Sequence, residues 1–226
     1  MASRQKSDLL TAETWIFDLD NTLYPASCNL FAQVDRKMGD FISDLLDIPY
    51  DDARGLQKQY FREHGTTLRG LMQVHGINPV DFLDFVHDID YSPVPRDRKL
   101  AAALDKLPGR KLIFTNGTVA HADSVLEQLG AAHHFDVIYD IIASDYIPKP
   151  NPAPYEKLIA EHDIDPTSSV MVEDMAKNLL HPAALGMHTV WVRTDADWAQ
   201  NDSDNADHIH HETDDLSAWL DDLVAT

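Results

Sequence analysis

The chain has 226 residues and is 44% hydrophobic, which is enough for a folded unit with a sizeable core. Its 38 acidic and 18 basic residues give a formal net charge of −20, which would repel nucleic-acid phosphates and anionic membrane surfaces. No apolar run approaches the roughly 18 residues that cross a bilayer, so we expect a protein that acts on a small molecule, without a nucleic-acid or membrane partner.

The amino-terminal region favours a cytoplasmic protein. Residues 1–8 lack the apolar segment of an export signal, and the single cysteine, Cys28, cannot form an internal disulfide. Both observations fit the reducing cytoplasm.

The first predicted strand, at residues 14–17, ends in a cluster of polar residues. Its apolar, β-branched and aromatic side chains are typical of a buried strand. Asp18 and Asp20 follow it, and in extended backbone a spacing of two points both side chains to the same side. Such residues can simply cap turns. They can also act as a nucleophile toward phosphorus and as an acid that protonates the departing oxygen.

Residues 27–91 have a helical pattern throughout. Apolar residues recur on one helical face at positions 31, 34, 38, 41, 42 and 45, and again at 82, 85, 86 and 89. Prolines flank the segment on both sides and can serve as connections between two units. We therefore predict a mobile helical cap at residues 25–94, inserted into a catalytic core of residues 1–24 and 95–226.

The predicted cap contains four candidates for substrate contact. The first is Arg69, followed by Thr66, Thr67 and His87. Surface or structural roles explain these residues equally well from the sequence alone.

The second predicted strand, at residues 111–114, leads into Thr115, Asn116 and Gly117. The hydroxyl and amide groups could bind phosphoryl oxygens, and a glycine would let the backbone approach a ligand. A plain cap of the following helix, whose apolar face recurs from residue 119 to 129, explains the same residues.

A third strand is predicted at residues 141–143, ahead of Lys149. Pro148 and Pro150 restrict the backbone around this lysine. Lys149 could neutralise an attacking carboxylate and a phosphoryl group, or it could be an ordinary surface lysine.

The strand predicted at residues 170–172 ends at Glu173 and Asp174. Acidic oxygens beside Asp18 would suit Mg²⁺, although an acidic pair can also cap a helix. Asn178 follows one helical turn later, where its amide could orient a ligand.

The end of the chain is expected to complete the core. Residues 189–192 read as a last strand, followed by an acidic stretch through residue 207 and a helix at 214–223. His208, His210 and His211 lack zinc-site spacing and indicate a late polar strand or loop.

Strands and helices alternate outside the cap, which predicts an α/β fold with a doubly wound parallel sheet. Ligands of such sheets bind outside the carboxyl ends of the strands. We therefore expect the four polar clusters to meet there.

Together, the four clusters resemble the four motifs of the haloacid dehalogenase superfamily of hydrolases, in the same order and across roughly residues 14–192. The resemblance implies a Rossmann-like core with a helical cap, Mg²⁺ and an aspartyl-phosphate intermediate. It assigns Asp18 as the nucleophile, Asp20 as general acid and base with its backbone carbonyl on the metal, Thr115 and Asn116 as phosphate donors, Lys149 as the charge clamp, Asp174 as a metal ligand, and Glu173 and Asn178 as supporting residues.

The resemblance also narrows the reaction. The second aspartate, Asp20, is a feature of the phosphatases and mutases of this superfamily, whereas its dehalogenases carry a different residue there. The stretches 17–25, 65–71 and 86–90 are similar to the pyrimidine 5′-nucleotidase branch, which implies hydrolysis of nucleoside 5′-monophosphates, UMP or CMP. Met175 departs from the small hydroxyl residue of many relatives.

Alternatives to this substrate remain. A phosphatase for another small phosphoester, such as phosphoglycolate or a sugar phosphate, would use the same core, and a non-catalytic binding protein could retain the fold. The sequence leaves the oligomeric state, the base preference and the pathway open.

Overall fold

Six short strands form a single sheet in the computed structural model of the chain, which describes residues 6–194 and 207–225. Their order across the sheet is β3-β2-β1-β4-β5-β6, and every neighbouring pair is parallel. The strands are β1 (Thr14–Phe17), β2 (Arg110–Phe114), β3 (Val137–Tyr139), β4 (Ser169–Glu173), β5 (His188–Val192) and β6 (His211–Thr213). The chain extends the sheet from β1 to β3 on one side and then returns to place β4 on the other side of β1. The predicted doubly wound parallel sheet is confirmed, with β1 at the point where the strand order reverses.

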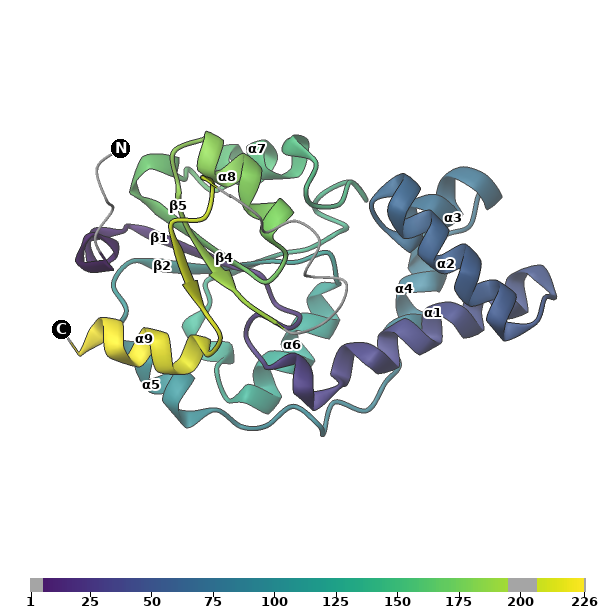
Figure 1. Cartoon of the computed structure of the whole chain (residues 1–226), viewed down its shortest axis with the longest axis horizontal. Helices are drawn as coiled ribbons and strands as arrows, with labels where there is room; N and C mark the ends of the chain where they lie inside the picture. Colours follow the sequence, from purple (N-terminus) through teal and green to yellow (C-terminus); the bar gives the residue numbers. More distant parts are fainter. Residues whose placement is uncertain (1–5, 195–206, 226) are drawn as a thin grey trace.

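Helices cover both faces of this sheet (Figure 1). The helices α5 (Arg98–Lys106), α6 (Val119–Leu129) and α9 (Leu216–Val224) lie on one face, and α7 (Pro152–Glu161) and α8 (Leu180–Ala184) lie on the other. Consecutive residues of β1 point to opposite faces, since Trp15 and Phe17 pack in the cluster with α5, α6 and α9 whereas Ile16 packs with α7. Burial on both faces explains why the central strands are apolar throughout.

Short 3₁₀ helices connect the larger elements. They are η1 (Lys6–Thr11), η2 (Ala26–Cys28), η3 (Ala132–His134), η4 (Pro166–Ser168) and η5 (Ala176–Leu179). The last of these follows Asp174 and so begins beside the carboxyl end of β4.

Four helices between β1 and α5 form a separate group to one side of the sheet (Figure 1). They are α1 (Leu30–Leu46), α2 (Tyr50–His64), α3 (Thr67–His75) and α4 (Pro79–His87), and we call them the helical unit. They surround their own apolar cluster, which includes Val34, Ile42, Leu71 and Phe82. A side-chain carbon at Gly70 of α3 would lie 2.5 Å from Cβ of Tyr60 on α2, so the two helices approach closely at that glycine.

The third strand was predicted at the wrong place. Residues 141–143 lie in turns, and β3 is the preceding run 137–139. The Asp140 carboxylate accepts hydrogen bonds from the backbone N–H groups of Ile142 (3.1 Å) and Ala143 (2.8 Å), which folds the chain back after β3. Ile141 then packs into the apolar cluster of the helical unit instead of a strand position.

The carboxyl-terminal part agrees with the prediction. Residues 189–192 lie in β5, and the late polar segment forms a short strand, β6, which contains His211 and adds to the edge of the sheet. The predicted acidic stretch lies mostly at residues 195–206, outside the described residues. The predicted last helix is present as α9, where the Asp215 side chain caps the N-terminus by accepting from the N–H of Ala218. Among the helices that the structure describes, none is long and apolar enough to span a bilayer.

Candidate active site

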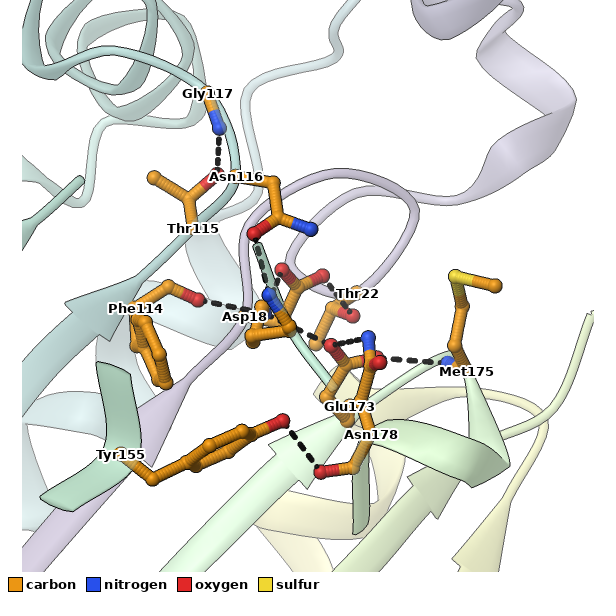
Figure 2. Close-up of polar contacts among 11 residues, drawn as sticks. Asp18, Thr22, Phe114, Thr115, Asn116, Gly117, Tyr155, Glu173, Met175 and Asn178 are labelled. Atoms are coloured by element: carbon orange, nitrogen blue, oxygen red, sulfur yellow. Dashed lines mark hydrogen bonds and ion pairs between the residues drawn. The ribbon is translucent and has the colours of Figure 1, made fainter. Parts of the chain in front are cut away.

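The polar residues that follow β1, β2 and β4 lie together at the carboxyl edge of the sheet (Figure 2). Asp18 follows β1, Thr115 follows β2, and Glu173 ends β4. Parallel pairing in register brings these strand ends to the same edge, because Phe17 lies beside Ile113 on one side and Val172 on the other. Residues 131 positions apart in the chain therefore come into direct contact.

Lys149 is at the centre of the contacts. Its side chain is buried, and Nζ donates to Asp18 Oδ1 (2.7 Å), Glu173 Oε1 (2.8 Å) and the backbone carbonyl of Phe114 (2.8 Å). The three protons of an ammonium group are thus matched by three acceptors. Burial alone would lower the pKa of Lys149, but the charges of Asp18 and Glu173 outweigh it and raise the pKa above its ordinary value. Lys149 is therefore a fixed positive charge.

The two carboxylate oxygens of Asp18 have different partners. Oδ1 accepts from Lys149, and Oδ2 accepts from a hydroxyl group. Oδ2 accepts from Thr22 Oγ1 at 2.8 Å, on the loop that follows β1 (Figure 2). Burial raises the pKa of the Asp18 carboxyl from 3.8 to about 7, with Lys149 opposing the shift and Glu173 adding to it. The carboxylate is consequently held where its negative charge is only partly compensated.

Glu173 is surrounded by donors. Oε1 accepts from Lys149 and from Asn178 Nδ2 (2.6 Å), and Oε2 accepts from the backbone N–H of Met175 (2.7 Å). The Asn178 carbonyl in turn accepts from Tyr155 OH at 2.8 Å (Figure 2). Glu173 and Asn178 thus hold Lys149 in place. Met175 contributes its backbone N–H to this network, so its departure from the small hydroxyl residue of many relatives does not affect this contact.

Asp174 points to the same centre with fewer compensating contacts. Burial raises its pKa well above the ordinary value, and the Glu173 and Asp18 charges add to the effect. The Asp174 backbone is fixed by Trp191, whose indole N–H donates to its carbonyl at 2.8 Å.

The carboxylates fit a divalent cation. Ligand atoms of Asp18, Glu173 and Asp174 lie within 4.8 Å of one another, and all three residues are buried. One ammonium group faces three carboxylates, so negative charge remains in excess, and oxygen ligands are those that Mg²⁺ prefers. The side-chain oxygen of Asn178 is also buried without a hydrogen-bond partner in the described structure. Because Glu173 is already occupied by three donors, Asp18 and Asp174 are the carboxylates best placed to hold the ion.

Thr115, Asn116 and Gly117 form a tight turn after β2. Thr115 Oγ1 accepts from the N–H of Gly117 at 2.9 Å, and Asn116 Oδ1 accepts from the backbone N–H of Lys149 at 3.0 Å. The Asn116 carbonyl oxygen is therefore engaged, while its amide nitrogen remains the group that can donate to a ligand. A side-chain carbon at Gly117 would lie 3.1 Å from His121 and 3.3 Å from Thr115 Oγ1, so it would press on both side chains.

Asp20 is held by two residues that sequence reasoning missed. Its Oδ1 accepts from His121 Nε2 (2.8 Å) and from Tyr24 OH (2.5 Å). Burial would raise the pKa of Asp20, but the His121 charge and the two hydrogen bonds outweigh it, so the pKa is lowered. His121 occupies a buried position on the apolar face of α6, where a histidine resembles a core residue, so the sequence carried no signal of its contact with Asp20.

The candidate substrate residues of the helical unit divide into two kinds. His87 reaches the site, because its ring stacks on His121 with centroids 4.4 Å apart. Thr66 caps α3 by accepting from the N–H of Arg69, and Thr67 Oγ1 lies 3.4 Å from the backbone carbonyl of Gln57. Arg69 forms no ion pair within the described part of the chain. The contacts of these three residues do not join them to the carboxylates.

His208 and His210, two of the three late histidines, form contacts within the core of the fold. His210 Nδ1 accepts from the N–H of Thr189 at 3.0 Å, and His208 Nε2 lies 2.9 Å from the Ala176 carbonyl. These contacts attach the segment before β6 to β5 and η5.

Comparison with known proteins adds a family and a fold. Residues 13–186 match the haloacid dehalogenase-like hydrolase family. Phosphate metabolism protein 8 of Saccharomyces cerevisiae is 28% identical over 193 residues, which are 77% of this chain and 60% of that protein. The chain thus spans less than two thirds of the length of this relative.

Solved structures resemble the chain at lower identity. CbbY from Rhodobacter sphaeroides in complex with phosphate has a TM-score of 0.64 and 16% identity over 93% of this chain and 99% of that one. YfnB from Bacillus subtilis bound to magnesium has a TM-score of 0.59 and 15% identity, over 94% and 98%. The L-2-haloacid dehalogenase PA0810 has a TM-score of 0.58 and 14% identity, over 95% and 100%. The chain resembles both a phosphate-bound protein and a dehalogenase, so these similarities show its fold but do not distinguish between the two reactions.

Proposed function

The chain belongs to the haloacid dehalogenase-like hydrolases, and on that premise we propose that it is a magnesium-dependent phosphatase of nucleoside 5′-monophosphates in the cytoplasm, with UMP and CMP as its substrates. The observation that carries the phosphatase reaction is the contact of Lys149 with Asp18 and Glu173, beside Asp174. It provides a nucleophilic carboxylate, a fixed cation and ligands for a metal in one buried place. The pyrimidine preference rests on the sequence stretches 17–25, 65–71 and 86–90.

In the first half of the reaction, a carboxylate oxygen of Asp18 bonds to phosphorus and the ester P–O bond breaks. The departing oxygen takes its proton from the protonated carboxyl of Asp20. The negative phosphoryl group of a bound substrate favours this protonated form, since a like charge raises a carboxyl pKa. Thr115 and Asn116 would donate to the phosphoryl oxygens, and Lys149 would offset their charge.

In the second half, Asp20 acts as a base. Its carboxylate takes a proton from water, the water oxygen bonds to phosphorus, and the bond between phosphorus and Asp18 breaks. Phosphate leaves and Asp18 is a free carboxylate again. Asp18, Asp174 and the backbone carbonyl of Asp20 would hold Mg²⁺, whose positive charge offsets the carboxylates and the phosphoryl group.

Asp20 favours phosphoester hydrolysis over dehalogenation. A dehalogenase releases a halide, which needs no proton, whereas an alkoxide leaving group does. Asp20 stands two residues after Asp18 and has its own two donors, His121 and Tyr24, so it is independent of the contacts around Lys149. Phosphate in the complex of CbbY and magnesium in YfnB support the same reading.

We further propose that residues 25–94 form a cap on a core made of residues 1–24 and 95–226. The helical unit contacts the core beside the site at two places near the C-terminal end of α2. Lys177 Nζ lies 4.8 Å from the ring centroid of Phe61, and a side-chain carbon at Gly65 would lie 3.4 Å from Pro148. A cap in this place would exclude water and select the leaving group, with Arg69, Thr66, Thr67 and His87 as substrate contacts.

The test is a substrate panel. Purified protein with Mg²⁺ should show its highest kcat/KM on UMP or CMP among the common nucleoside monophosphates, phosphoglycolate and sugar phosphates, measured by phosphate release. A clear preference for phosphoglycolate or a sugar phosphate would select that alternative. No release from any ester, including aryl phosphates, from protein with bound Mg²⁺ would favour a binding protein.

Asp20→Asn separates the two halves of the reaction. The variant should still form the phosphoenzyme from an ester with an activated leaving group, and should hydrolyse it much more slowly than wild type. Acid quenching at successive times would measure both steps. Equal slowing of both steps would contradict the acid and base role.

A further inference from the structure

We propose that His121 is a positioning residue, which fixes the orientation of the Asp20 carboxylate for proton transfer to and from the phosphoryl site. This inference rests on the proposed function, since it assigns a role to the residue that holds the proposed acid and base.

The first argument is the direction of the hydrogen bonds. His121 Nε2 and Tyr24 OH both bond to the same oxygen of Asp20, Oδ1. Two donors on one oxygen fix the rotation of the carboxylate, which a single donor would not do. The other oxygen, Oδ2, is left for the proton that is transferred.

The second argument is where Oδ2 lies. Asp20 Oδ2 and Thr115 Oγ1 lie 3.8 and 3.3 Å from one point, the position that a side-chain carbon of Gly117 would occupy. Thr115 is a candidate donor to the phosphoryl oxygens. The Asp20 oxygen without a fixed donor is therefore on the side of the proposed phosphoryl group.

The third argument is that His121 itself cannot turn. It is 1% exposed, its ring stacks on His87 at an interplanar angle of 19°, and its Nδ1 lies 3.1 Å from Tyr91 OH. Its backbone N–H donates to Thr118 Oγ1, the N-cap of α6. The ring is thus held on one face and at both nitrogens.

The capping of α6 explains how a loop next to the site supplies such a rigid group. Thr118 begins the helix one residue after Gly117, so His121 falls in the first turn and on the buried face. Since His87 belongs to α4, the helical unit contributes one of the surfaces that hold the ring.

A purely structural role for His121 makes a different prediction. A histidine that only fills the core would affect stability, and any loss of activity would be the same for all esters. A residue that positions an acid matters most where the leaving group needs a proton.

The experiment compares two aryl esters. p-Nitrophenyl phosphate releases a stable anion, whereas phenyl phosphate releases an oxygen that benefits from protonation. His121→Phe keeps a ring that can stack on His87 but removes the donor. It should slow first-turnover release of phenol by about 100-fold and release of nitrophenol by less than about tenfold.

Two further variants serve as rescue and control. His121→Gln returns an amide N–H toward Asp20 and should recover part of the loss on phenyl phosphate. Gln128→Ala, at an exposed position of the same helix, should match wild type on both esters. Equal losses on both esters in folded His121→Phe, or no advantage of His121→Gln over His121→Phe, would overturn the proposal.

Two further readouts complement the His121 variants, and the first of them does not require a His121 variant to fold. Tyr24→Phe removes the other donor to Oδ1. Like His121→Phe, it should slow the release of phenol more than the release of nitrophenol. Crystal structures of wild type and of the His121 variants should show the Asp20 carboxylate rotated only where the donor is lost, and an unchanged orientation would overturn the proposal. Wild-type hydrolysis of aryl esters without hydrolysis of UMP or CMP would refute the proposed substrate and leave the His121 assignment to these results.

Discussion

The carboxyl edge of the sheet and the helical unit hold their polar side chains in different ways. At the sheet edge, Lys149 joins Asp18 and Glu173 across 131 and 24 residues, and every partner is buried. In the helical unit, Arg54 pairs with Asp35 across 19 residues on neighbouring helices, and Thr66 bonds only three residues ahead. The difference indicates that the polar contacts at the sheet edge join distant parts of the chain, while those of the helical unit cap its helices or hold neighbouring helices together.

Removal of the proposed nucleophile at the sheet edge should cause the largest loss of activity. Asp18→Asn keeps nearly the same shape but cannot form the bond to phosphorus, so turnover should fall at least about 1,000-fold. The fold should remain, because Lys149 keeps Glu173 and the backbone carbonyl of Phe114 as partners. Phosphate release and thermal unfolding measure the two effects, and unchanged release would disprove the assignment.

Removal of Mg²⁺ is expected to have the second largest effect on turnover. Excess EDTA should abolish activity and added Mg²⁺ should restore it, and full rates in EDTA would exclude the metal role. Because burial raises the pKa of Asp18 to about 7, a proton occupies this carboxyl below that pH and must leave when the ion binds.

The affinity for Mg²⁺ should therefore rise with pH. Deprotonation of Asp18 contributes up to about tenfold per pH unit from pH 5 to 7, and Asp174, whose pKa is also raised, adds to the slope. Titration calorimetry at several pH values would measure this slope. In Asp18→Asn the slope should be shallower, and an equal slope would show that Asp18 is not the group that titrates.

Loss of the Lys149 ammonium group should lower the free energy of unfolding as well as the activity. Lys149→Met leaves the buried carboxylates of Asp18 and Glu173 without their shared partner, which costs about 3–5 kcal/mol of unfolding free energy. Denaturant unfolding would measure it. Lys99→Met is the control, since Lys99 and Asp221 are half exposed and 3.7 Å apart, and their pair contributes less than about 1 kcal/mol.

The smallest effect is expected in the helical unit. Arg69→Ala should raise the KM for UMP by about tenfold and leave turnover of p-nitrophenyl phosphate unchanged, because it removes a contact to the distant part of the substrate. Arg36→Ala, at an exposed position of the same unit, is the control. Equal effects of Arg69→Ala on both substrates would assign it to the chemistry or to the fold.

Much of the sheet was predictable because its central strands are short apolar runs that stop at polar residues. Residues 14–17, 111–114 and 170–172 all lie in strands, whereas the order of the strands across the sheet was not predicted and comes from the structure. The strand β3 was missed because two apolar runs, 137–139 and 141–143, stand side by side. Only the turn made by Asp140 and the packing of Ile141 on the helical unit decide between them.

The site was partly predictable for the same reason. Asp18, Lys149 and Asp174 each stand where a strand or a proline-bounded loop ends, so their residue types carry a signal. His121 carries none, because a histidine on the apolar face of a helix looks like core and its partner, Asp20, is 101 residues away. Tyr24 and Thr22 are close to Asp20 and Asp18 in sequence, but their hydroxyl contacts depend on the turn after β1.

The triple contact of Lys149 has a consequence for how the protein matures. One amine joins the end of β1, the end of β2 and the end of β4. A ribosome must therefore deliver the polypeptide past Asp174 before any competent centre exists, however early the first half collapses. The centre is thus complete once β4 has joined the sheet, while β5 and β6 still follow in the chain.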